Sequence, residues 1–181
     1  MYGPLLKGSN FLLRPPRLED AIDMIGWFEK MEITRKMPLR FPLSLEQEEG
    51  WLKEKAADPN TVLWTIDASG ILIGTTCIEQ IDWHNRRGIT GTLIGRSESW
   101  GQGIGGELMH LRADFAFTQL PLNKLSSAYL EGNEASRRAQ LAAGYKEIGR
   151  CRQEFFREGR WVDRVLTELL REEWLTLQDD R

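Results

Sequence analysis

Histidine and cysteine, the side chains that most often bind metals or act as activated nucleophiles, are scarce: the 181 residues contain two of each. His84 and His110 are far apart, and neither has a second Cys or His at ligand spacing beside it. Cys77 and Cys151 are also distant, which argues against a disulfide framework. No serine or cysteine lies in a nucleophile-elbow pattern. We therefore expect no metal, and the sequence gives little support to His-dependent nucleophilic catalysis.

Long apolar runs and clusters of one charge are also missing. No segment approaches the roughly 20 apolar residues of a membrane-spanning helix, and the first residues contain no apolar run of signal-peptide length. Basic residues number 24 and acidic residues 27, without any block of Lys or Arg, whereas nucleic-acid-binding proteins normally cluster their positive charge. These absences predict a cytoplasmic protein with neither a membrane nor a nucleic acid as its partner.

The composition that remains is that of a folded globular protein. Hydrophobic residues make up 41% of the chain and charged residues 28%, which excludes disordered, collagen-like and fibrous classes. At roughly 100–200 residues per domain, the length predicts one domain over residues 1–181.

Hydrophobic periodicity, with Gly and Pro as punctuation, predicts alternating short strands and helices. The predicted strands cover residues 11–14, 62–66, 71–78, 88–95, 124–130, 145–156 and 161–170. The predicted helices cover residues 18–28, 44–57, 104–115 and 133–142. Ser44 and Gln47 fit a capping box, Asn133 is a good N-cap, and Gly144 suits a left-handed helix end. The order is typical of a mixed α/β (α+β) fold with about seven strands and four helices.

The most informative segment is glycine-rich and reads Trp100-Gly101-Gln102-Gly103-Ile104-Gly105-Gly106-Glu107-Leu108. It lies between a predicted strand and a predicted helix. Four glycines in six positions let the backbone approach a ligand closely, and the free N–H groups at a helix start attract an anion. We expect a phosphate or pyrophosphate here. The alternative is that the glycines only permit tight packing of the helix on the sheet.

A dinucleotide-binding motif is a further alternative, because Gly101, Gly103 and Gly106 match G-x-G-x-x-G. In that motif the glycines follow the strand directly, and an acidic residue about 20 positions later holds the ribose. Here residues 96–100 intervene, and Ser126 and Ser127 occupy the ribose-binding offset. The motif therefore fits poorly, and a P-loop is excluded because no Gly-Lys-Ser/Thr follows.

Several motifs in order resemble the GCN5-related N-acetyltransferases (GNAT), in the branch of ribosomal-protein N-terminal (alanine), spermidine and amino-sugar acetyltransferases. They are Leu12-Leu13-Arg14-Pro15, Ile81-Asp82-Trp83, Leu93-Ile94-Gly95 with the glycine-rich segment, Asn133-Glu134-Ala135-Ser136 through Gly144-Tyr145, and the hairpin around Glu158-Gly159. The resemblance covers nearly the whole chain. It implies a central mixed, largely antiparallel sheet with a V-shaped splay between two central strands.

The resemblance implies acetyl-CoA as the acetyl donor. In the family, backbone N–H groups of the glycine-rich loop and helix start hold the pyrophosphate, and a splayed strand pairs with the pantetheine arm. The first role carries over to Gln102, Gly103, Ile104, Gly105 and Gly106. The second carries over to Leu93, Ile94 and Gly95, where an N–H group faces the thioester carbonyl and stabilises the oxyanion. Asn133 and Ser136 then lie beside the pantetheine and sulfur, and Arg138 reaches the nucleotide.

Two groups of the family's usual chemistry are absent. The tyrosine that serves as the acid toward the departing thiolate is replaced by Gln140, and Ser136 is the substitute we favour, with ordinary helix capping as its other role. The glutamate at the start of the fourth strand is replaced by Ile89 and Thr90. Glu79 and Glu131 are the remaining candidates for the base, and solvent-facing strand positions would explain them equally well.

The sequence thus predicts an acetyl-CoA-dependent N-acetyltransferase that transfers the acetyl group directly to a primary amine. The acceptor is a small molecule, such as a polyamine, amino sugar or aminoglycoside, or a peptide or protein N-terminus. A non-catalytic acyl-CoA-binding or sensing module is the main alternative, and a dinucleotide-binding protein is a weaker one. A homodimer is the usual assembly in the family.

Overall fold

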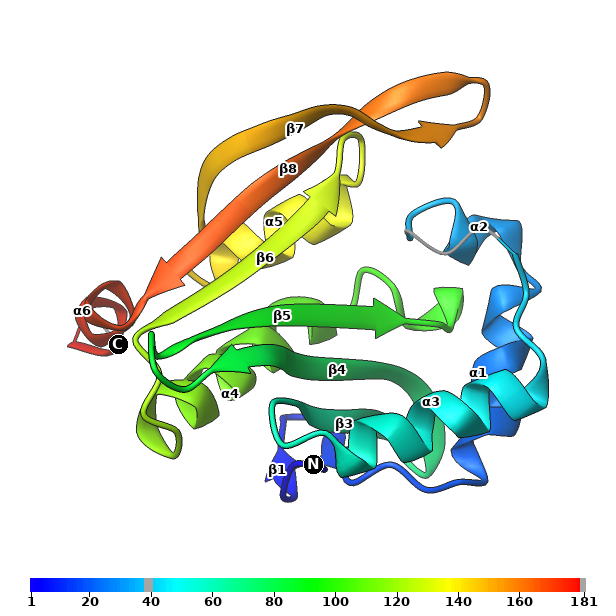
Figure 1. Cartoon of the computed structure of the whole chain (residues 1–181), viewed down its shortest axis with the longest axis horizontal. Coiled ribbons are helices and arrows are strands. Elements are labelled where there is room, and N and C mark those ends of the chain that lie inside the picture. The colour runs from blue at the N-terminus through cyan, green and yellow to red at the C-terminus, as the bar shows by residue number, and fades with distance from the viewer. Residues whose placement is uncertain (38–40, 180–181) are drawn as a thin grey trace. The chain divides into compact units, whose positions relative to one another are not determined.

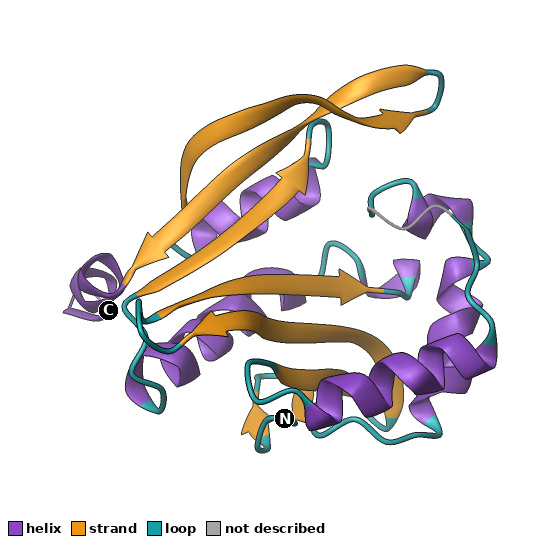
Figure 2. Ribbon diagram, in the orientation of Figure 1, coloured by secondary structure: helices purple, strands orange, loops and turns teal. Residues whose placement is uncertain are grey.

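Eight strands form one mixed sheet in the computed structural model, which describes residues 1–37 and 41–179, and their order is β1-β2-β3-β4-β5-β6-β8-β7 (Figure 1). The strands are β1 (Leu6–Lys7), β2 (Leu12–Arg14), β3 (Val62–Ala68), β4 (Ile71–Asp82), β5 (Arg87–Ile94), β6 (Lys124–Leu130), β7 (Lys146–Arg157) and β8 (Arg160–Leu170). The helices in Figure 2 are α1 (Asp20–Phe28), α2 (Met31–Thr34), α3 (Leu45–Ala57), α4 (Ile104–Thr118), α5 (Glu134–Ala142) and α6 (Arg171–Asp179), with a 3-10 turn η1 (Ser97–Ser99). Within the described ranges, no helix is both long and apolar enough to cross a membrane.

The mixed α/β fold expected from the sequence is confirmed. Strand β6 has the predicted bounds, and α3 starts at the predicted capping box, where Ser44 Oγ accepts from Gln47 N at 3.2 Å and Ser44 N donates to Gln47 Oε1 at 2.9 Å. The predicted seven strands and four helices omit β1, α2 and α6. Strand β1 and helix α2 have two and four residues, too few for periodicity to show, and α6 follows β8 without any Gly or Pro to mark the change.

The contacts divide the chain into two compact units. The first unit comprises Met1–Glu79 and Gly91–Gln102, and the second comprises Gln80–Thr90 and Gly103–Arg181. Strands β4 and β5 each pass from one unit into the other. The single domain over residues 1–181 stays a prediction.

The core of the first unit lies between α1, α3 and the antiparallel strands β3 and β4. Helix α1 turns three residues at three-residue steps toward it, so that they share one face of the helix. The buried cluster consists of Ala21, Met24, Trp27, Leu52, Leu63 and Leu72. Full burial of a Leu or Met side chain stabilises the fold by about 1.5–3 kcal/mol.

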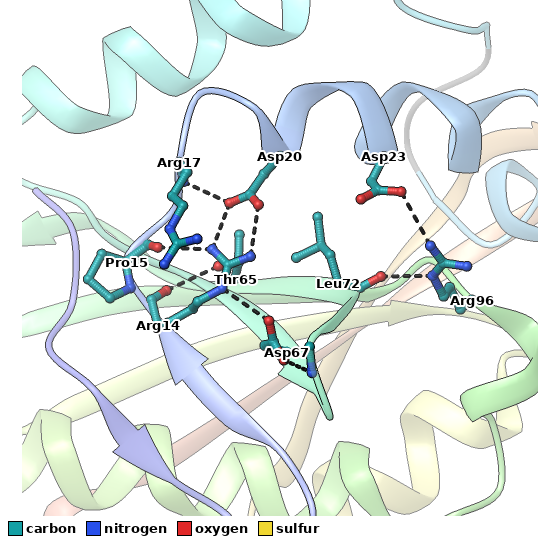
Figure 3. A network of polar contacts seen from close by, with 10 residues as sticks. Arg14, Pro15, Arg17, Asp20, Asp23, Thr65, Asp67, Leu72 and Arg96 are labelled. Atoms are coloured by element: carbon teal, nitrogen blue, oxygen red, sulfur yellow. Dashed lines mark hydrogen bonds and ion pairs between the residues drawn. The ribbon is translucent and has the colours of Figure 1, made fainter.

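A network of ion pairs joins β2, β3 and the first turn of α1 (Figure 3). Arg14 donates to the two carboxylate oxygens of Asp20 at 2.8 Å each and to Asp67 at 3.3 Å. Asp20 also accepts from the backbone N–H of Arg17 at 2.7 Å, and the Thr65 hydroxyl donates to the Arg14 carbonyl oxygen at 3.2 Å. The hydrogen bond with Asp20 raises the pKa of the Arg14 guanidinium, against the opposing effect of burial. This network explains the Leu-Leu-Arg-Pro motif as a structural one.

The second unit is built on the antiparallel strands β6, β8 and β7. Strands β6 and β8 pair along the whole of β6, from Lys124↔Leu170 to Leu130↔Arg164. Helix α5 connects β6 to β7 and lies beside β6 and β8 in Figure 1. It ends as predicted at Gly144, whose φ of 89° is accessible to glycine without strain.

Hydroxyl groups continue the contact between the parallel strands β5 and β6 beyond their last registered pair, Ile89↔Ser126. The Thr90 hydroxyl donates to the Ser126 carbonyl oxygen at 3.2 Å, and the Ser127 hydroxyl donates to the Thr90 carbonyl oxygen at 3.1 Å. The Tyr145 hydroxyl lies 3.2 Å from Thr90 Oγ1. Since Thr90 has already used its one hydrogen, Tyr145 is the donor. Thr90 therefore holds the two strands together.

Candidate functional site

The glycine-rich segment forms the turn into α4 and leaves the start of this helix without a side-chain cap. Gly103 is the N-cap residue, with a φ of 80° in the left-handed region, and Gly101 has a φ of 77°. The first hydrogen bond inside the helix runs from Glu107 N to Gly103 O at 3.3 Å. The N–H groups of residues 104–106 therefore have no acceptor within the helix.

The starts of α3 and α5 differ from that of α4, because each is closed by a side chain. Ser44 closes α3, and Asn133 closes α5 by accepting from Ser136 N at 3.2 Å. An open helix start presents free N–H groups and the positive end of the helix dipole, and both attract an anion. In this unit, the start of α4 is therefore suited to a phosphate group.

The space around these glycines bears on whether tight packing explains them. A Cβ built on Gly101, Gly103 or Gly106 would meet no atom within 4 Å. Packing therefore does not require glycine at these positions, which argues against the alternative raised from the sequence. The open glycine start leaves room for a phosphate or pyrophosphate group. Gln102 is exposed beside it and donates from Nε2 to the Glu98 carbonyl oxygen at 2.8 Å.

The predicted pantetheine strand forms the end of β5 in the first unit. Leu93 is partly buried against the core cluster, and the Trp100 indole donates to the Ile94 carbonyl oxygen at 3.0 Å. Gly95 has a packing reason for its identity, because a Cβ there would lie 2.1 Å from Cδ2 of Trp27. Its assignment to the cofactor stays a prediction.

Helix α2 is tied to the turn that precedes the glycines, also within the first unit. The Ser97 hydroxyl donates to Glu32 Oε1 at 2.8 Å, and Lys36 Nζ lies 3.9 Å from the centroid of the Trp100 ring. Burial lowers the pKa of Lys36. These two contacts, one hydrogen bond and one cation–π interaction, hold the turn in place.

The start of α5 carries a short chain of polar groups that ends at Ser136. Gln140 is 2% exposed, and its Nε2 donates both to the Ala128 carbonyl oxygen and to Ser136 Oγ at 3.1 Å each. The Thr167 hydroxyl, on β8 and 1% exposed, donates to Gln140 Oε1 at 2.5 Å. Ser136 itself is half-buried. Its hydroxyl is therefore linked to the interior and still reachable from outside.

Asn133 and Arg138 lie on the same helix. Asn133 uses its oxygen as the N-cap and keeps its amide nitrogen without a partner among the described residues. Arg138 is exposed, and its Nε donates to the Glu134 carbonyl oxygen at 3.3 Å. Helices α4 and α5 pack against each other, and in Figure 1 they run in the same direction.

Both predicted bases already hold a cation. Glu79 in β4 accepts from Lys55 Nζ at 3.0 Å, and Glu131 lies 3.5 Å from Arg150. Burial acts to lower the pKa of Lys55, but its hydrogen bond with Glu79 and the charge of Glu79 raise it overall. In each pair one carboxylate oxygen is engaged, by Lys55 or by Arg150.

Gln140 is the residue whose role the sequence did not reveal, since it was identified only as the place where a tyrosine is missing. The i, i+4 spacing of Ser136 and Gln140 on one helix was the available signal. Thr167 gave none, because it reaches Gln140 from a strand 27 positions further on.

The predicted residues fall in both units. Glu79, Leu93, Ile94, Gly95 and Gln102 belong to the first unit, and Gly103, Ile104, Gly105, Gly106, Glu131, Asn133, Ser136 and Arg138 belong to the second. In residues 1–37 and 41–179, no three His, Cys, Asp or Glu side chains are grouped so that they could hold a metal ion.

Comparison with known families identifies most of the chain. A model of the acetyltransferase (GNAT) domain matches residues 10–146. The chain is 27% identical over 165 residues to the uncharacterized N-acetyltransferase YoaA of Bacillus subtilis, which covers 88% of this chain and 93% of YoaA. It is 26% identical over 132 residues to the L-methionine sulfoximine/L-methionine sulfone acetyltransferase of Pseudomonas aeruginosa, covering 71% and 75% of the two chains.

A solved structure gives the same fold. The spermidine N-acetyltransferase of Vibrio cholerae, crystallised with CoA and spermine, superposes with a TM-score of 0.85 at 22% identity and covers 93% of this chain and 99% of that one. At this identity the likeness concerns the fold alone.

Proposed function

Because the chain belongs to the GNAT family of N-acetyltransferases, we propose that it transfers the acetyl group of acetyl-CoA directly to a primary amine. The acceptor is the amine of a small molecule, such as a polyamine, amino sugar or aminoglycoside, or a protein N-terminus. The observation that carries the choice of donor is the open start of α4, where residues 104–106 present free N–H groups beside glycines with unfilled space. That arrangement binds a pyrophosphate without a basic side chain.

The other cofactor roles follow from the resemblance and are part of the proposal. Leu93, Ile94 and Gly95 would hold the pantetheine arm, and a backbone N–H group there would stabilise the oxyanion. Asn133 would use its free amide nitrogen toward the pantetheine. Arg138, exposed on α5, would reach the nucleotide.

The chemistry requires the amine to lose a proton. A primary amine with a pKa near ~10 is mostly protonated at neutral pH, so a base or a chain of water molecules must accept that proton. If Glu79 or Glu131 is this base, replacing it by Gln lowers turnover most below the pH optimum. Unchanged pH–rate profiles for E79Q and E131Q would remove both from the mechanism.

The direct test is release of free thiol from acetyl-CoA in the presence of a panel of amines that covers the four acceptor classes. We expect steady thiol release with one class and an acetylated product of the corresponding mass. Tight CoA binding without turnover on any amine would contradict the proposal and favour an acyl-CoA-binding module. Stabilisation against heat by NAD(P) in place of CoA would contradict the choice of donor.

A further inference from the structure

We propose that Gln140 is a positioning residue, anchored by Thr167, that turns the Ser136 hydroxyl so that its hydrogen is free for the sulfur of the departing coenzyme. The inference rests on the proposed function, because it assumes that CoA binds with its sulfur beside Ser136. All the contacts that carry it lie within the second unit.

The orientation of the Gln140 amide is fixed by its neighbours. The Ala128 carbonyl oxygen, 3.1 Å from Gln140 Nε2, can only accept a hydrogen bond, so the amide nitrogen must face it. The amide oxygen then faces Thr167, which has to donate. The opposite orientation would place the amide oxygen against the Ala128 carbonyl oxygen in a buried site, where neither atom can donate.

The hydrogen bonds of Gln140 leave the hydroxyl hydrogen of Ser136 available. One hydrogen of the Gln140 nitrogen goes to Ala128, and the other goes to Ser136 Oγ at 3.1 Å. Ser136 Oγ is therefore an acceptor toward the interior. Its own hydrogen has no acceptor among the described residues, and the side chain is half-buried. The hydroxyl can thus donate outward, toward a ligand at the start of α5.

The chemical step that uses this donor is the departure of sulfur. As the amine nitrogen forms the C–N bond, the C–S bond breaks and its electron pair stays on sulfur as a thiolate. Ser136 keeps its proton and donates a hydrogen bond to that charge, while the proton released from nitrogen passes to solvent. A hydrogen bond to a charged acceptor is about twice as strong as a neutral one. The Thr167–Gln140–Ser136 chain therefore supplies a donor where the family's tyrosine is absent.

The first experiment needs no acceptor and measures the pKa of the CoA thiol bound to the protein, from the ultraviolet absorbance of the thiolate. We expect this pKa to be about one to two pH units lower in the wild type than in S136A. Q140L and T167V should give thiol pKa values between those of the wild type and S136A, because each leaves the Ser136 hydroxyl less firmly oriented. T167S, which keeps the donor to Gln140, should behave as the wild type.

The second experiment measures steady-state kinetics with an acceptor found in the amine panel. S136A should lower kcat by about 10- to 100-fold, with KM for acetyl-CoA changed by about twofold or less. Q140L and T167V should also lower kcat. Q178L is the matched control, because Gln178 is also in the second unit and donates to Asp114 at 3.3 Å on another helix. It should leave kcat and the thiol pKa unchanged.

The outcomes separate the two proposals. A wild-type protein that binds no CoA would refute the proposed donor, and the role of Gln140 would fall with it. A protein that binds CoA with the same thiol pKa in the wild type and all variants would refute only the positioning role. A raised thiol pKa in S136A, with Q140L and T167V equal to the wild type, would also refute it, because Ser136 would then act without Gln140.

Discussion

Two buried polar clusters, one in each unit, are built in opposite ways. Around Arg14 the network is closed: the guanidinium spans Asp20 and Asp67, and Asp20 takes a further hydrogen bond from the backbone of Arg17 (Figure 3). Around Gln140 the hydrogen bonds form an open chain. This chain starts at the buried Thr167 and ends at Ser136, whose hydroxyl hydrogen has no acceptor among the described residues. The closed cluster can only hold the fold together, whereas the open chain has one bond left to offer a ligand.

The largest effect is expected from breaking the closed network. R14M should lower the free energy of unfolding by about 3–5 kcal/mol, because it leaves two largely buried carboxylates without their cation. The control is D23N, also in α1, which removes the ion pair between Asp23 and Arg96. The side chains of Asp23 and Arg96 are 52% and 38% exposed. That control should cost about 0–1 kcal/mol. Urea unfolding measures both, and equal losses would contradict the distinction.

The two ends of the open chain should respond differently. T167V should lower the free energy of unfolding by about 1–3 kcal/mol, since the buried Gln140 oxygen loses its donor. S136A should change it by about 0.5 kcal/mol or less, because water can replace the half-buried hydroxyl. A stability loss in S136A as large as that in T167V would mean that Ser136 belongs to the closed type of cluster.

Glycine substitutions test the open start of α4 in the same way. G106A should weaken CoA binding by about 10-fold, since the Cβ enters the space assigned to the pyrophosphate, while the helix gains up to about 1 kcal/mol because alanine is the better helix former. G26A is the matched control in α1, where a Cβ also meets no atom within 4 Å. Calorimetric titration with CoA should show equal affinity for G26A and the wild type. Equal affinity for G106A would argue against the site.

The smallest effect concerns the Tyr129–Glu147 pair. The Tyr129 hydroxyl donates to Glu147 in the second unit. Burial is the larger cause and this hydrogen bond the next, and together they raise the pKa of Tyr129 to about 12. The same bond lowers the pKa of Glu147, against the effect of burial. The hydrogen bond to the Glu147 carboxylate stabilises the fold fully when the pH is above the ordinary carboxyl pKa. This stabilisation is lost as the pH falls through the lowered pKa of Glu147. The Tyr129 contribution is present below pH 10.0, its ordinary pKa, and is lost as pH rises toward 12.

Y129F should therefore differ most from the wild type between about pH 5 and pH 10, and the difference should shrink at both ends. Urea unfolding across this range checks the profile. A difference that does not vary with pH would show that the hydrogen bond is not coupled to either titration.

The features that are local in sequence could be predicted, and those made by distant residues could not. The capping box at Ser44, the Asn133 cap and the open glycines before α4 each depend on neighbours within a few positions, and all three occur as expected. The partners of Gln140 are set by the pairing of β6 with β8, which no local pattern encodes. The packing of Gly95 shows the same limit, because the side chain that requires glycine there is the distant Trp27, which no local pattern indicates.

The most direct test of the whole account is a crystal structure of the protein with CoA. We predict that the pyrophosphate lies on the N–H groups of residues 104–106 and that the CoA sulfur lies within hydrogen-bond distance of Ser136 Oγ, with Gln140 still bonded to Ser136. A pyrophosphate bound elsewhere would contradict the proposed donor site. A sulfur out of reach of Ser136, with the pyrophosphate in place, would contradict the role given to the open chain.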